Sequence, residues 1–591
     1  MPFTEANLPM QIITPLGPDK LFVRSVEGEE RISSLFFYRV EFYSEDPALD
    51  FTRIVGKSVT LQIPLASGNS EYVNGIAGRF GQSGRDKRFT TYVAEIRPSL
   101  WTLTMNADCR IFQNMTAPDI IKKVFSDLGF SAFKDCLTAT YQSRDYCVQY
   151  RETAFAFVSR LMEEEGICYF FTHESGAHTM VLADDASAWP VCTDLAAARY
   201  GGTPGVWDSD DVIAECTIEQ VVTVGQYKAD DYSFVNPSTD LLSTAAGAET
   251  TRSIYDYPGL YTVQSDGDAI TSRRLSAFEV EGHIIRGNGS CRSFHGGAKF
   301  SMSGHYRDDA NTAYVLRSLS VQATQEGYRN SFEAFPASAT FRPPSITPRP
   351  VIAGTQTATV VGKSGEEIWT DQYGRVTVQF HWDQLGTNNE TSSCWIRVAQ
   401  GWAGKAWGSI FIPRIGQEVV VSFLEGNPDR PLITGCVYNA DFAVPYPLPD
   451  SQTKSTIKTN SSKGGNGFNE FRFEDKAGSE EILMQAQKDM NVNVLNNQTI
   501  TVTNDRAITV SKGNETHNVK GTRTLTITGN ESHTNKADYT SDVSGNFTLK
   551  VSGNLSIEAS GSVSIKAGTS FDNKAGTALT NNAGTELTNK A

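Results

Sequence analysis

The pattern of apolar and polar residues predicts short β-strands over most of the chain ahead of its C-terminal part. Apolar and polar side chains alternate along 36–42 and 58–63, and a period of two is typical of half-buried strands. Further short strands, at 375–380, 395–398 and 418–423, are broken by glycine and proline. Strands at this spacing indicate a small closed barrel in the middle of the chain.

Two segments of the N-terminal region predict helices instead. The first covers 119–128, has a proline at its first turn and stops at Gly129. The second starts at Thr153, a residue type that caps helix N-termini, and ends at Gly166, which permits the left-handed backbone of a C-cap. The N-terminal region is therefore expected to be mainly β with two helices.

The C-terminal part repeats every eight residues, with glycine at a fixed position and, two residues before several glycines, a branched aliphatic side chain. Ala537 takes the place of one glycine. Because eight is an even number, each repeat returns its side chains to the same face of an extended chain, and glycine permits a corner. The pattern predicts inward apolar columns, such as Leu549, Ile557 and Ile565. The residues that define the repeat are Gly513, Gly521, Gly529, Gly545, Gly553, Gly561, Val519, Ile527, Val543 and Val551.

The length of the repeat predicts that three chains share it. An eight-residue unit is one strand and one corner, whereas single-chain β-solenoids generally use longer coils. About a dozen such units in one chain would stack to only ~20 Å, but three intertwined chains would form a prism of about 55–60 Å without open edges. Ile500, Val502, Ile508 and Val510 keep the period one residue out of phase, which predicts a bulge between residues 511 and 518.

The composition of the chain changes at residue 449. All 23 prolines lie at or before Pro449, and the chain beyond it has no Pro, Cys or Trp. Two proline clusters, at 335–350 and 445–449, are typical of linkers. The nine cysteines include no C-x-x-C pair, so we expect buried, reduced thiols and no cysteine zinc site. No cofactor is expected.

Charge and hydropathy argue against two classes of partner. The chain carries 52 Lys+Arg and 67 Asp+Glu, a net charge of −15, with no locally basic segment, which argues against a nucleic-acid partner. No run approaches ~18 apolar residues, so no stable membrane span is expected. The first ten residues lack a basic start and an apolar run, so we expect no Sec signal and, for any export, another route.

Several long motifs carry a resemblance to a known family. They are residues 370–383 (TDQYGRVTVQFHWD), 392–398 (SSCWIRV), 401–404 (GWAG), 411–420 (FIPRIGQEVV), 423–431 (FLEGNPDRP), 435–439 (GCVYN), 469–476 (NEFRFEDK), 485–490 (QAQKDM) and, upstream, 150–153 (YRET) and 157–166 (FVSRLMEEEG). The chain resembles VgrG, the valine-glycine repeat spike of bacterial type VI secretion, over essentially its whole length, and it is also similar to phage tail hub and baseplate spike proteins.

The resemblance implies a homotrimer with a mainly β fold. The expected parts are hub β-barrel domains with a few helices, an OB-type barrel and a C-terminal intertwined trimeric β-helix, a triangular prism. Two hub barrels from each of three chains would give the pseudo-sixfold symmetry that docking on a hexameric tube requires. The expected boundaries are 1–145 (first hub barrel), 146–340 (hub domain with second barrel), 341–350 (Pro-rich linker), 351–445 (OB-type barrel), 446–490 (neck) and 491–591 (octad-repeat needle).

The resemblance also implies a mechanical function. Such a spike caps the secretion tube, pierces the target envelope and carries a PAAR-repeat tip protein with its effector, and baseplate components are further partners. The protein would be made in the cytoplasm, assemble on the baseplate and be secreted or injected. The effector or adaptor and the target cells stay open. So does truncation after Ala591, where the sequence stops inside its repeat with no effector segment after the needle.

The sequence predicts no enzyme. About sixty residues separate the barrel end near Asn439 from the first repeats, too few for the lysozyme domain of the related phage spike. The three acids that end the second helix (Glu163, Glu164 and Glu165) are interpreted as a solvated helix end. Gly362-Lys-Ser364 lacks the first glycine of a phosphate loop and is expected in a barrel hairpin, and Gly81-Gln-Ser-Gly84 lacks the spacing of a nucleophile elbow.

Histidines supply the candidate metal ligands. His173 and His178 flank a hairpin-like turn with no third ligand in view, and His295-Gly-Gly297 is interpreted as a turn. His517 and His533 lie two repeats apart in the inward column, so each would form a ring of three imidazoles on a threefold axis. Such a ring would bind a metal, an anion or water, and channel water satisfies it most simply.

Another function class stays open, a trimeric carbohydrate-binding tail-spike or adhesin that reads sugars through its barrel. A glycan site needs an exposed aromatic cleft. Trp395, Trp402 and Trp407 are the candidates, although they stand within family motifs whose tryptophans belong more often to a core. A cryptic hydrolase is a third class, which an assay on peptidoglycan tests.

Overall fold

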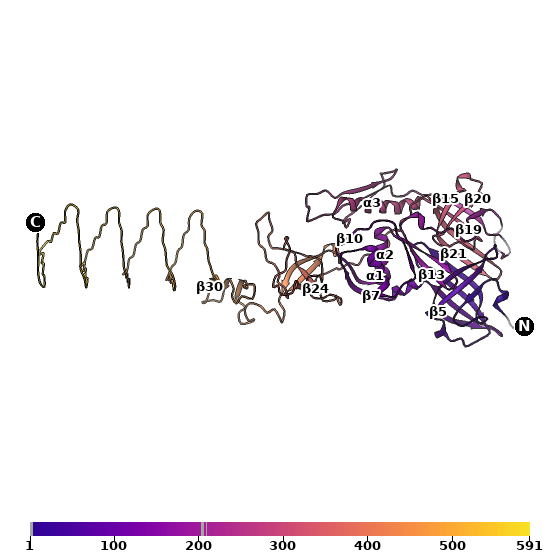
Figure 1. The fold of residues 1–591 in the computed structure, drawn as a ribbon, viewed down its shortest axis with the longest axis horizontal. Helices are drawn as coiled ribbons and strands as arrows, with labels where there is room; N and C mark the ends of the chain where they lie inside the picture. The colour runs from indigo at the N-terminus through magenta and orange to yellow at the C-terminus, as the bar shows by residue number, and fades with distance from the viewer. Residues whose placement is uncertain (1–3, 203–205, 208–209, 591) are drawn as a thin grey trace. The chain divides into compact units, whose positions relative to one another are not determined.

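The computed structural model describes residues 4–202, 206–207 and 210–590. The expectations that rest on the very first residues and on Ala591 lie outside this range. The chain divides into two compact units, Met1–Asn491 and Val492–Ala591, and each is described by itself (Figure 1). Both units are mainly extended chain, as the sequence predicts. The six-part division of the chain stays a prediction.

One twelve-stranded sheet dominates the described part of the first unit. Its strand order is β1-β4-β5-β6-β3-β2-β21-β20-β14-β15-β19-β22, and β21 also pairs with β22, so its second half closes into a ring. Two barrel-like halves therefore share one continuous sheet through the β2–β21 pairing. The strands are β1 (Gln11–Ile13), β2 (Phe22–Arg31), β3 (Phe37–Ser44), β4 (Ser58–Pro64), β5 (Ser70–Arg85), β6 (Thr90–Arg97), β14 (Ala197–Tyr200), β15 (Val212–Gln220), β19 (His283–Gly289), β20 (Lys299–Ser303), β21 (Ala313–Thr324) and β22 (Gly327–Pro336).

The sheet carries its core on alternate residues of its strands. In β3, Tyr38, Val40 and Phe42 are buried, while the residues between them are half-buried or exposed. This alternation confirms the strand that the sequence predicts at 36–42, and β4 confirms the one at 58–63, although three successive residues of β4 (59–61) are buried. Seven short 3₁₀ helices complete the described chain, at Glu5–Asn7, Phe51–Arg53, Ser99–Met105, Ala186–Ala188, Val280–Gly282, Asp308–Ala310 and Leu424–Gly426.

Two predicted helices, α1 (Ala117–Asp127) and α2 (Ala154–Glu165), are confirmed, α1 with its first-turn proline and α2 with both of its caps. The Thr153 hydroxyl accepts a hydrogen bond from the Ala156 amide at 3.1 Å, and Gly166 ends α2 with a φ of 70°. The two helices pack with short β-ladders. Some of these ladders pair strands from before and after position 145, where the sequence predicts a domain boundary. The ladder strands are β7 (Ala107–Phe112), β8 (Met115–Thr116), β9 (Phe133–Cys136), β10 (Ser143–Arg144), β11 (Cys147–Thr153), β12 (Cys168–Glu174) and β13 (Ala177–Ala183).

A third helix, α3 (Gln264–Glu279), adds to the two that the sequence predicts in this region. It packs on a small sheet of β16 (Gln226–Ala229), β17 (Ser243–Ala246) and β18 (Ser253–Asp256). The helix has no side-chain N-cap, and Gly267, Thr271 and Leu275 are its buried residues. Its sequence therefore lacks both the start signal and the apolar stripe by which a helix is recognised.

The middle of the chain forms the predicted small barrel. The strand order is β24-β23-β26-β27-β25, and a bridge between Val376 and Ile396 joins the two edges. Val360, Val378 and Val419 fill the core with no exposed surface. Three antiparallel strands follow, β28 (Lys454–Lys458), β29 (Glu470–Glu474) and β30 (Glu481–Gln485). The barrel strands are β23 (Gln356–Val361), β24 (Thr377–Phe380), β25 (Arg397–Val398), β26 (Glu418–Phe423) and β27 (Pro431–Val437).

The second unit, here called the tail (residues 492–590), winds as an open coil whose turns are separated from one another (Figure 1). The chain bends at 512–513 and then every eight residues as far as 584–585, at the positions of the repeat glycines and of Ala537. The preceding bend, at 503–504, lies nine residues before, so a slip of one residue is present, but it falls between the bends at 503–504 and 512–513 and not across the predicted 511–518. Gly513 sits at this irregular corner with a φ of 96°.

No helix among the described residues combines the length and the apolar character that crossing a membrane needs.

Candidate functional site

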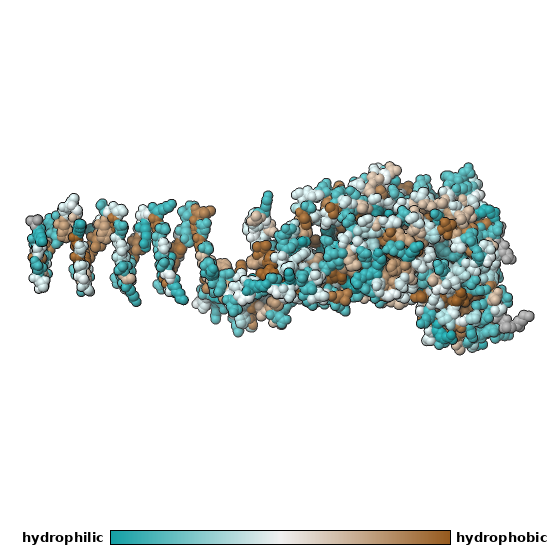
Figure 2. All heavy atoms as spheres, in the orientation of Figure 1, coloured by the Kyte–Doolittle hydropathy of each residue, from teal (hydrophilic) through white to brown (hydrophobic). Residues whose placement is uncertain are grey.

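The apolar columns of the tail are uncovered in the single chain. Leu549, Ile557 and Ile565, which the sequence places in one column, are 60%, 70% and 68% exposed. Figure 2 shows apolar residues in brown along the winding tail, between hydrophilic ones. The described tail residues form no β-ladder within the chain, so neither these side chains nor the backbone amides find partners there. The columns are therefore a candidate surface for assembly with further chains.

The two tail histidines lie on this uncovered surface. A ring nitrogen of His517 lies 2.6 Å from Glu515 Oε1, and the ring of His533 packs edge-on against Tyr539. A ring of three imidazoles needs three chains, so the proposed rings at His517 and His533 stay a prediction.

The C-terminal end of α2 is the centre of an ionic cluster, and the interpretation of Glu163–Glu165 as a solvated helix end is wrong. Glu164 Oε2 pairs with Arg144 Nη1 at 2.6 Å, and Glu164 Oε1 pairs with Arg349 Nη2 at 2.5 Å. Arg160, one turn earlier in α2, lies 3.6 Å from the same carboxylate with its side chain only 2% exposed. The Glu164 carboxylate thus joins β10, α2 and the proline-rich linker.

The neighbouring acids hold other segments to the same helix end. The Glu163 carboxylate accepts hydrogen bonds from the backbone amides of Ile346 and Thr347 at 2.9 and 2.8 Å. The Glu165 carboxylate pairs with Arg144 at 2.6 Å and lies 3.5 Å from Arg273 of α3. Adjacent residues do splay around the helix, as expected. Their partners come from elements distant in the sequence, which is why the residues are half-buried.

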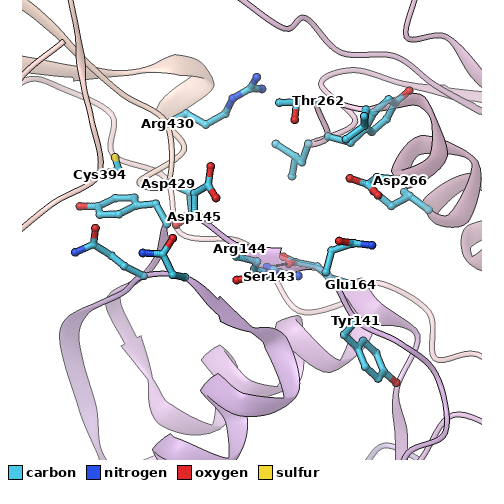
Figure 3. A pocket seen from close by; sticks show the side chains of 18 of the residues that line it. Tyr141, Ser143, Arg144, Asp145, Glu164, Thr262, Asp266, Cys394, Asp429 and Arg430 are labelled. Carbon is cyan, nitrogen blue, oxygen red and sulfur yellow. Dashed lines mark hydrogen bonds and ion pairs between the residues drawn. The ribbon is translucent and has the colours of Figure 1, made fainter. Parts of the chain in front are cut away.

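The turn before β27 ties the small barrel into this cluster. Asp429 Oδ1 accepts the backbone N–H of Val148 in β11 at 2.7 Å, and Arg430 pairs with Asp231 at 2.8 Å. A groove of about 1260 Å³ runs between these elements, and Figure 3 shows Arg144, Glu164, Asp429 and Arg430 along it. These charged groups pair with one another or with neighbouring chain segments, an arrangement that holds domains together. We call this ionic cluster the junction (Arg144, Arg160, Glu164, Arg349 and Asp429).

Burial and pairing set the protonation of the junction. Burial raises the pKa of Glu164, but Arg349, Arg144 and Arg160 together hold it well below its ordinary value of 4.5. Burial lowers the pKa of Arg144, and the neighbouring carboxylate of Glu164 outweighs that effect and raises it. Burial raises the pKa of Asp429 in spite of Arg160 and Arg349. Glu164 is therefore the firmly ionised carboxylate of the junction.

His173 and His178 flank the β12–β13 hairpin, as the sequence predicts, but a second buried cluster changes the interpretation of His173 and His295. The structure brings His295 and Glu30 to His173, so the His173–His178 hairpin does meet further metal-ligating side chains. His295 is part of this cluster and is not merely a turn residue. Burial lowers the pKa of His295, but Glu30 outweighs it and raises the value to about 10, while burial lowers that of His173 to about 3. Among the described residues, Glu30, His173 and His295 lie close enough together that they could hold a metal ion.

The remaining sequence candidates are placed as follows. Trp402 and Trp407 are 65% and 57% exposed and pack edge-on against each other, so neither belongs to a core of the single chain. Gly362-Lys-Ser364 follows β23 in the connection to its hairpin partner β24, as expected, and residues 81–84 lie inside β5.

All nine cysteines are free. Four of them are buried, whereas Cys436 is exposed, contrary to expectation.

Family comparisons agree with the order of these parts along the chain. The sequence matches the family described as "Phage tail baseplate hub (GPD)" over residues 29–327. Residues 357–438 match the "Type VI secretion system/phage-baseplate injector OB domain". Residues 455–567 match the "Bacteriophage T4 gp5 C-terminal trimerisation domain". The three matches cover most of the sheet, the small barrel and the larger part of the repeat, respectively.

The curated relatives include several proteins of Pseudomonas aeruginosa. The type VI secretion system spike protein VgrG1c is 43% identical over 516 residues, which cover 84% of this chain and 71% of that protein. VgrG1a is 43% identical over 505 residues, which cover 83% of this chain and 78% of that protein. The actin cross-linking toxin VgrG1 of Vibrio cholerae is 34% identical over 509 residues, 82% of this chain but 46% of that protein.

Solved structures share the fold at lower sequence identity. The E. coli c3393 protein, a component of the type VI secretion system, has a TM-score of 0.54 at 20% identity, covering 72% of this chain and all of that one. The half-lidded Francisella PdpA–VgrG complex contains a chain with a TM-score of 0.51 at 9% identity, covering 81% of this chain and 88% of that one. Both likenesses concern the fold.

Proposed function

Because the chain belongs to the VgrG family of type VI secretion system spike proteins, we propose that three copies form a spike that caps the secretion tube and punctures the target envelope. The observation that carries this proposal is the uncovered apolar columns of the tail, with Leu549, Ile557 and Ile565 exposed in the single chain. Side chains that need two further chains to be buried give the trimer its driving force.

The physics of the tail suits a puncturing needle. Each large aliphatic side chain removed from water contributes about 2 kcal/mol, and every layer of a three-chain prism contains three of them. The residues between the columns are mostly Thr, Ser, Asn and Lys, which stay hydrated on the outside. Because each strand would bond to two other chains, local fraying would have to break contacts with both. Such a rod transmits force along its axis without unravelling.

The partners follow from the same architecture. Two barrel-like halves in each of three chains would present six similar surfaces to a hexameric tube protein. At the needle end, a PAAR-repeat tip protein would complete the point and carry an effector. We propose that the protein has no catalytic step of its own, is made in the cytoplasm without a Sec signal, and assembles on the baseplate before it is secreted or injected.

A mass measurement with electron microscopy of the full chain tests the assembly. We expect particles of three chains with a broad head and a thin, protease-resistant shaft. A compact monomer whose C-terminal part is readily digested would contradict the proposal. In a bacterium with the secretion system, deletion of residues 492–591 is expected to abolish delivery to neighbouring cells. Unchanged delivery would contradict the puncturing function even if the trimer were present.

The exposed Trp402–Trp407 pair supports a second candidate, a trimeric carbohydrate-binding tail-spike or adhesin. Exposed indole rings are typical of surfaces that stack on sugars, although in a trimer they also suit contacts between chains. A glycan array with the purified trimer, without any tube protein, separates the two. Binding that Trp402→Ala and Trp407→Ala abolish would favour the lectin function, and absence of binding would exclude it.

A further inference from the structure

The interior of the twelve-stranded sheet contains a cluster of titratable side chains that the spike function does not use. Glu30 lies near the end of β2, His173 lies in β12, and His295 lies in the connection between β19 and β20. Their side chains are 5%, 0% and 14% exposed. Three chain segments that are far apart in sequence thus bring one carboxylate and two imidazoles together in the interior.

The donor atoms of these residues converge on one point. Glu30 Oε1 lies 2.9 Å from His295 Nδ1 and 4.0 Å from His173 Nε2, and one donor atom from each residue lies within 4.8 Å of the other two. Two ligands of a tetrahedral zinc ion, each about 2.0–2.1 Å from the metal, are roughly 3.3 Å apart. The observed separations lie on both sides of that value, so small side-chain rotations bring all three donors to one ion.

The surroundings orient these donors as they do in metal sites. His173 Nδ1 lies 3.2 Å from both the carbonyl oxygen and the amide nitrogen of Asn74, so the Asn74 backbone occupies this nitrogen and Nε2 faces the cluster. His295 Nε2 lies 3.4 Å from Glu71 Oε1, and Tyr38 donates a hydrogen bond to Glu30 Oε1 at 2.6 Å. Ligating histidines commonly direct their second nitrogen at a carbonyl or carboxylate in this way.

Unsatisfied polar atoms provide an independent sign of a missing cation. His173 Nε2 and Glu71 Oε2 are buried and have no hydrogen-bond partner, and His295 Nε2 has only the long ion pair with Glu71 Oε1 at 3.4 Å. Within the described residues, histidines supply every ion pair of the Glu30 and Glu71 carboxylates. Two buried carboxylates with no lysine or arginine ion-paired to them leave negative charge that a divalent cation would neutralise.

We propose that Glu30, His173 and His295 bind one divalent transition-metal ion of the zinc class in each chain. Two imidazoles and a carboxylate form a donor set that suits zinc. A water molecule or Glu71 would complete the coordination. His178 is excluded as a ligand because its Nδ1 faces Asn74 Oδ1 at 2.7 Å and its Nε2 accepts the Ser99 amide at 2.9 Å. The ion would fasten three distant segments of the sheet region to one another.

Metal content of the full, tag-free protein tests this site. Bound metal is removed from the protein with EDTA, the protein is dialysed against micromolar Zn²⁺, and its metal content is measured by inductively coupled plasma mass spectrometry. We expect one zinc ion per chain, and loss of that ion in Glu30→Gln and in His173→Gln. The matched control is the double variant His517→Gln/His533→Gln, which removes the tail rings and is expected to keep the ion. Absence of zinc from the wild-type protein, or its retention by both cluster variants, would overturn the proposal.

A cluster variant that does not fold would lose the metal for a trivial reason, so a second experiment looks for a new absorption band instead of a loss of metal. With Co²⁺ alone, the wild-type protein should show the intense visible absorption of a four-coordinate ion, and His173→Cys should add a sulfur-to-cobalt charge-transfer band. A Co²⁺-loaded His173→Cys protein without that band would overturn the assignment of His173. Because metal content is independent of assembly, a failure here would leave the spike proposal intact, and the reverse also holds.

Discussion

The first unit and the tail contain the same kinds of apolar side chain, but in the single chain these side chains are buried in the first unit and exposed in the tail. In the small barrel, Val360, Val378 and Val419 have no exposed surface, because the strands that cover them belong to the same chain. In the tail, Val551 and Leu549 alternate with polar residues just as regularly, yet they are 43% and 60% exposed. The difference shows that a period of apolar residues specifies a face, and that what covers the face depends on where the next strand comes from.

Charged residues show the same contrast. At the junction of the first unit, the side chains of Arg160 and Glu164 are 2% and 14% exposed and are paired with each other and with distant segments. In the tail, His517 and Glu515 form a contact in which both side chains are at least half exposed. A buried pair loses much when one partner is removed, whereas an exposed one contributes little. The first unit is therefore expected to respond strongly to single polar changes, and the tail to apolar ones.

The largest effect is expected from Leu549→Asp in the tail. The substitution removes about 2 kcal/mol of apolar burial per chain and places three carboxylates together in the prism interior. We expect loss of the trimer in analytical ultracentrifugation and rapid proteolysis of the tail, while the first unit stays folded. Lys550→Glu, the adjacent polar position, is the control and is expected to leave the trimer intact. A stable Leu549→Asp trimer would contradict the inward column.

A smaller effect, on the other region, is expected from Glu164→Gln at the junction. The change leaves Arg144, Arg160 and Arg349 without their shared carboxylate, which costs about 3 kcal/mol for a buried ionic group that loses its partner. Urea unfolding followed by tryptophan fluorescence measures it. Glu45→Gln, which breaks an exposed pair with Arg88, is the control, with an expected cost of about 0.5 kcal/mol. Equal costs for the two variants would show that the junction is not a buried ionic site.

The junction should also make the stability of the first unit sensitive to acid. A carboxyl group whose pKa is lowered by folding stabilises the fold above its unfolded pKa, and this contribution is lost as the pH falls through the folded value. For Glu164 the loss begins below about 4.5. We expect the free energy of unfolding to decline over that range more steeply in the wild type than in Glu164→Gln. Parallel declines would assign the acid sensitivity to other groups.

The smallest effect is expected at the irregular corner of the tail. Gly513 has a φ of 96°, which an L-residue adopts at a cost of about 1 kcal/mol, so Gly513→Ala should lower the melting temperature of the shaft. Gly545 lies at a regular corner, without such a φ, and Gly545→Ala should be nearly neutral. Calorimetry of the two variants compares them directly. If the melting temperature falls by the same amount in both variants, the slip of one residue does not strain the backbone at Gly513.

Local signals in the sequence were sufficient for much of the fold. Thr153 and Gly166 mark the ends of α2 because capping depends on side chains and backbone angles within a few residues. The family and the mainly β fold are likewise confirmed, since long motifs and a strict repeat persist along the chain. Helix α3 was missed because tertiary contacts, and not a cap or an apolar stripe, hold its sixteen residues.

The candidate sites were predictable only in part. The tail columns follow from spacing alone, because a strict period of eight fixes which side chains share a face. The junction and the Glu30–His173–His295 cluster did not follow, since they join distant segments: Asp429 contacts Val148 281 positions away, and His295 contacts Glu30 265 positions away. No local pattern distinguishes Glu164 from a solvated glutamate.

The amino-acid sequence by itself determined the period of the tail, the presence of α1 and α2 with the caps of α2, and the kind of protein to which the chain belongs. Only the tertiary structure decided that three consecutive glutamates end in a buried ionic junction, and that Glu30, His173 and His295 share one interior site. The physical reason is that periodicity and capping act over a few residues along the chain. Burial and pairing of charge depend on which distant strands the fold brings together.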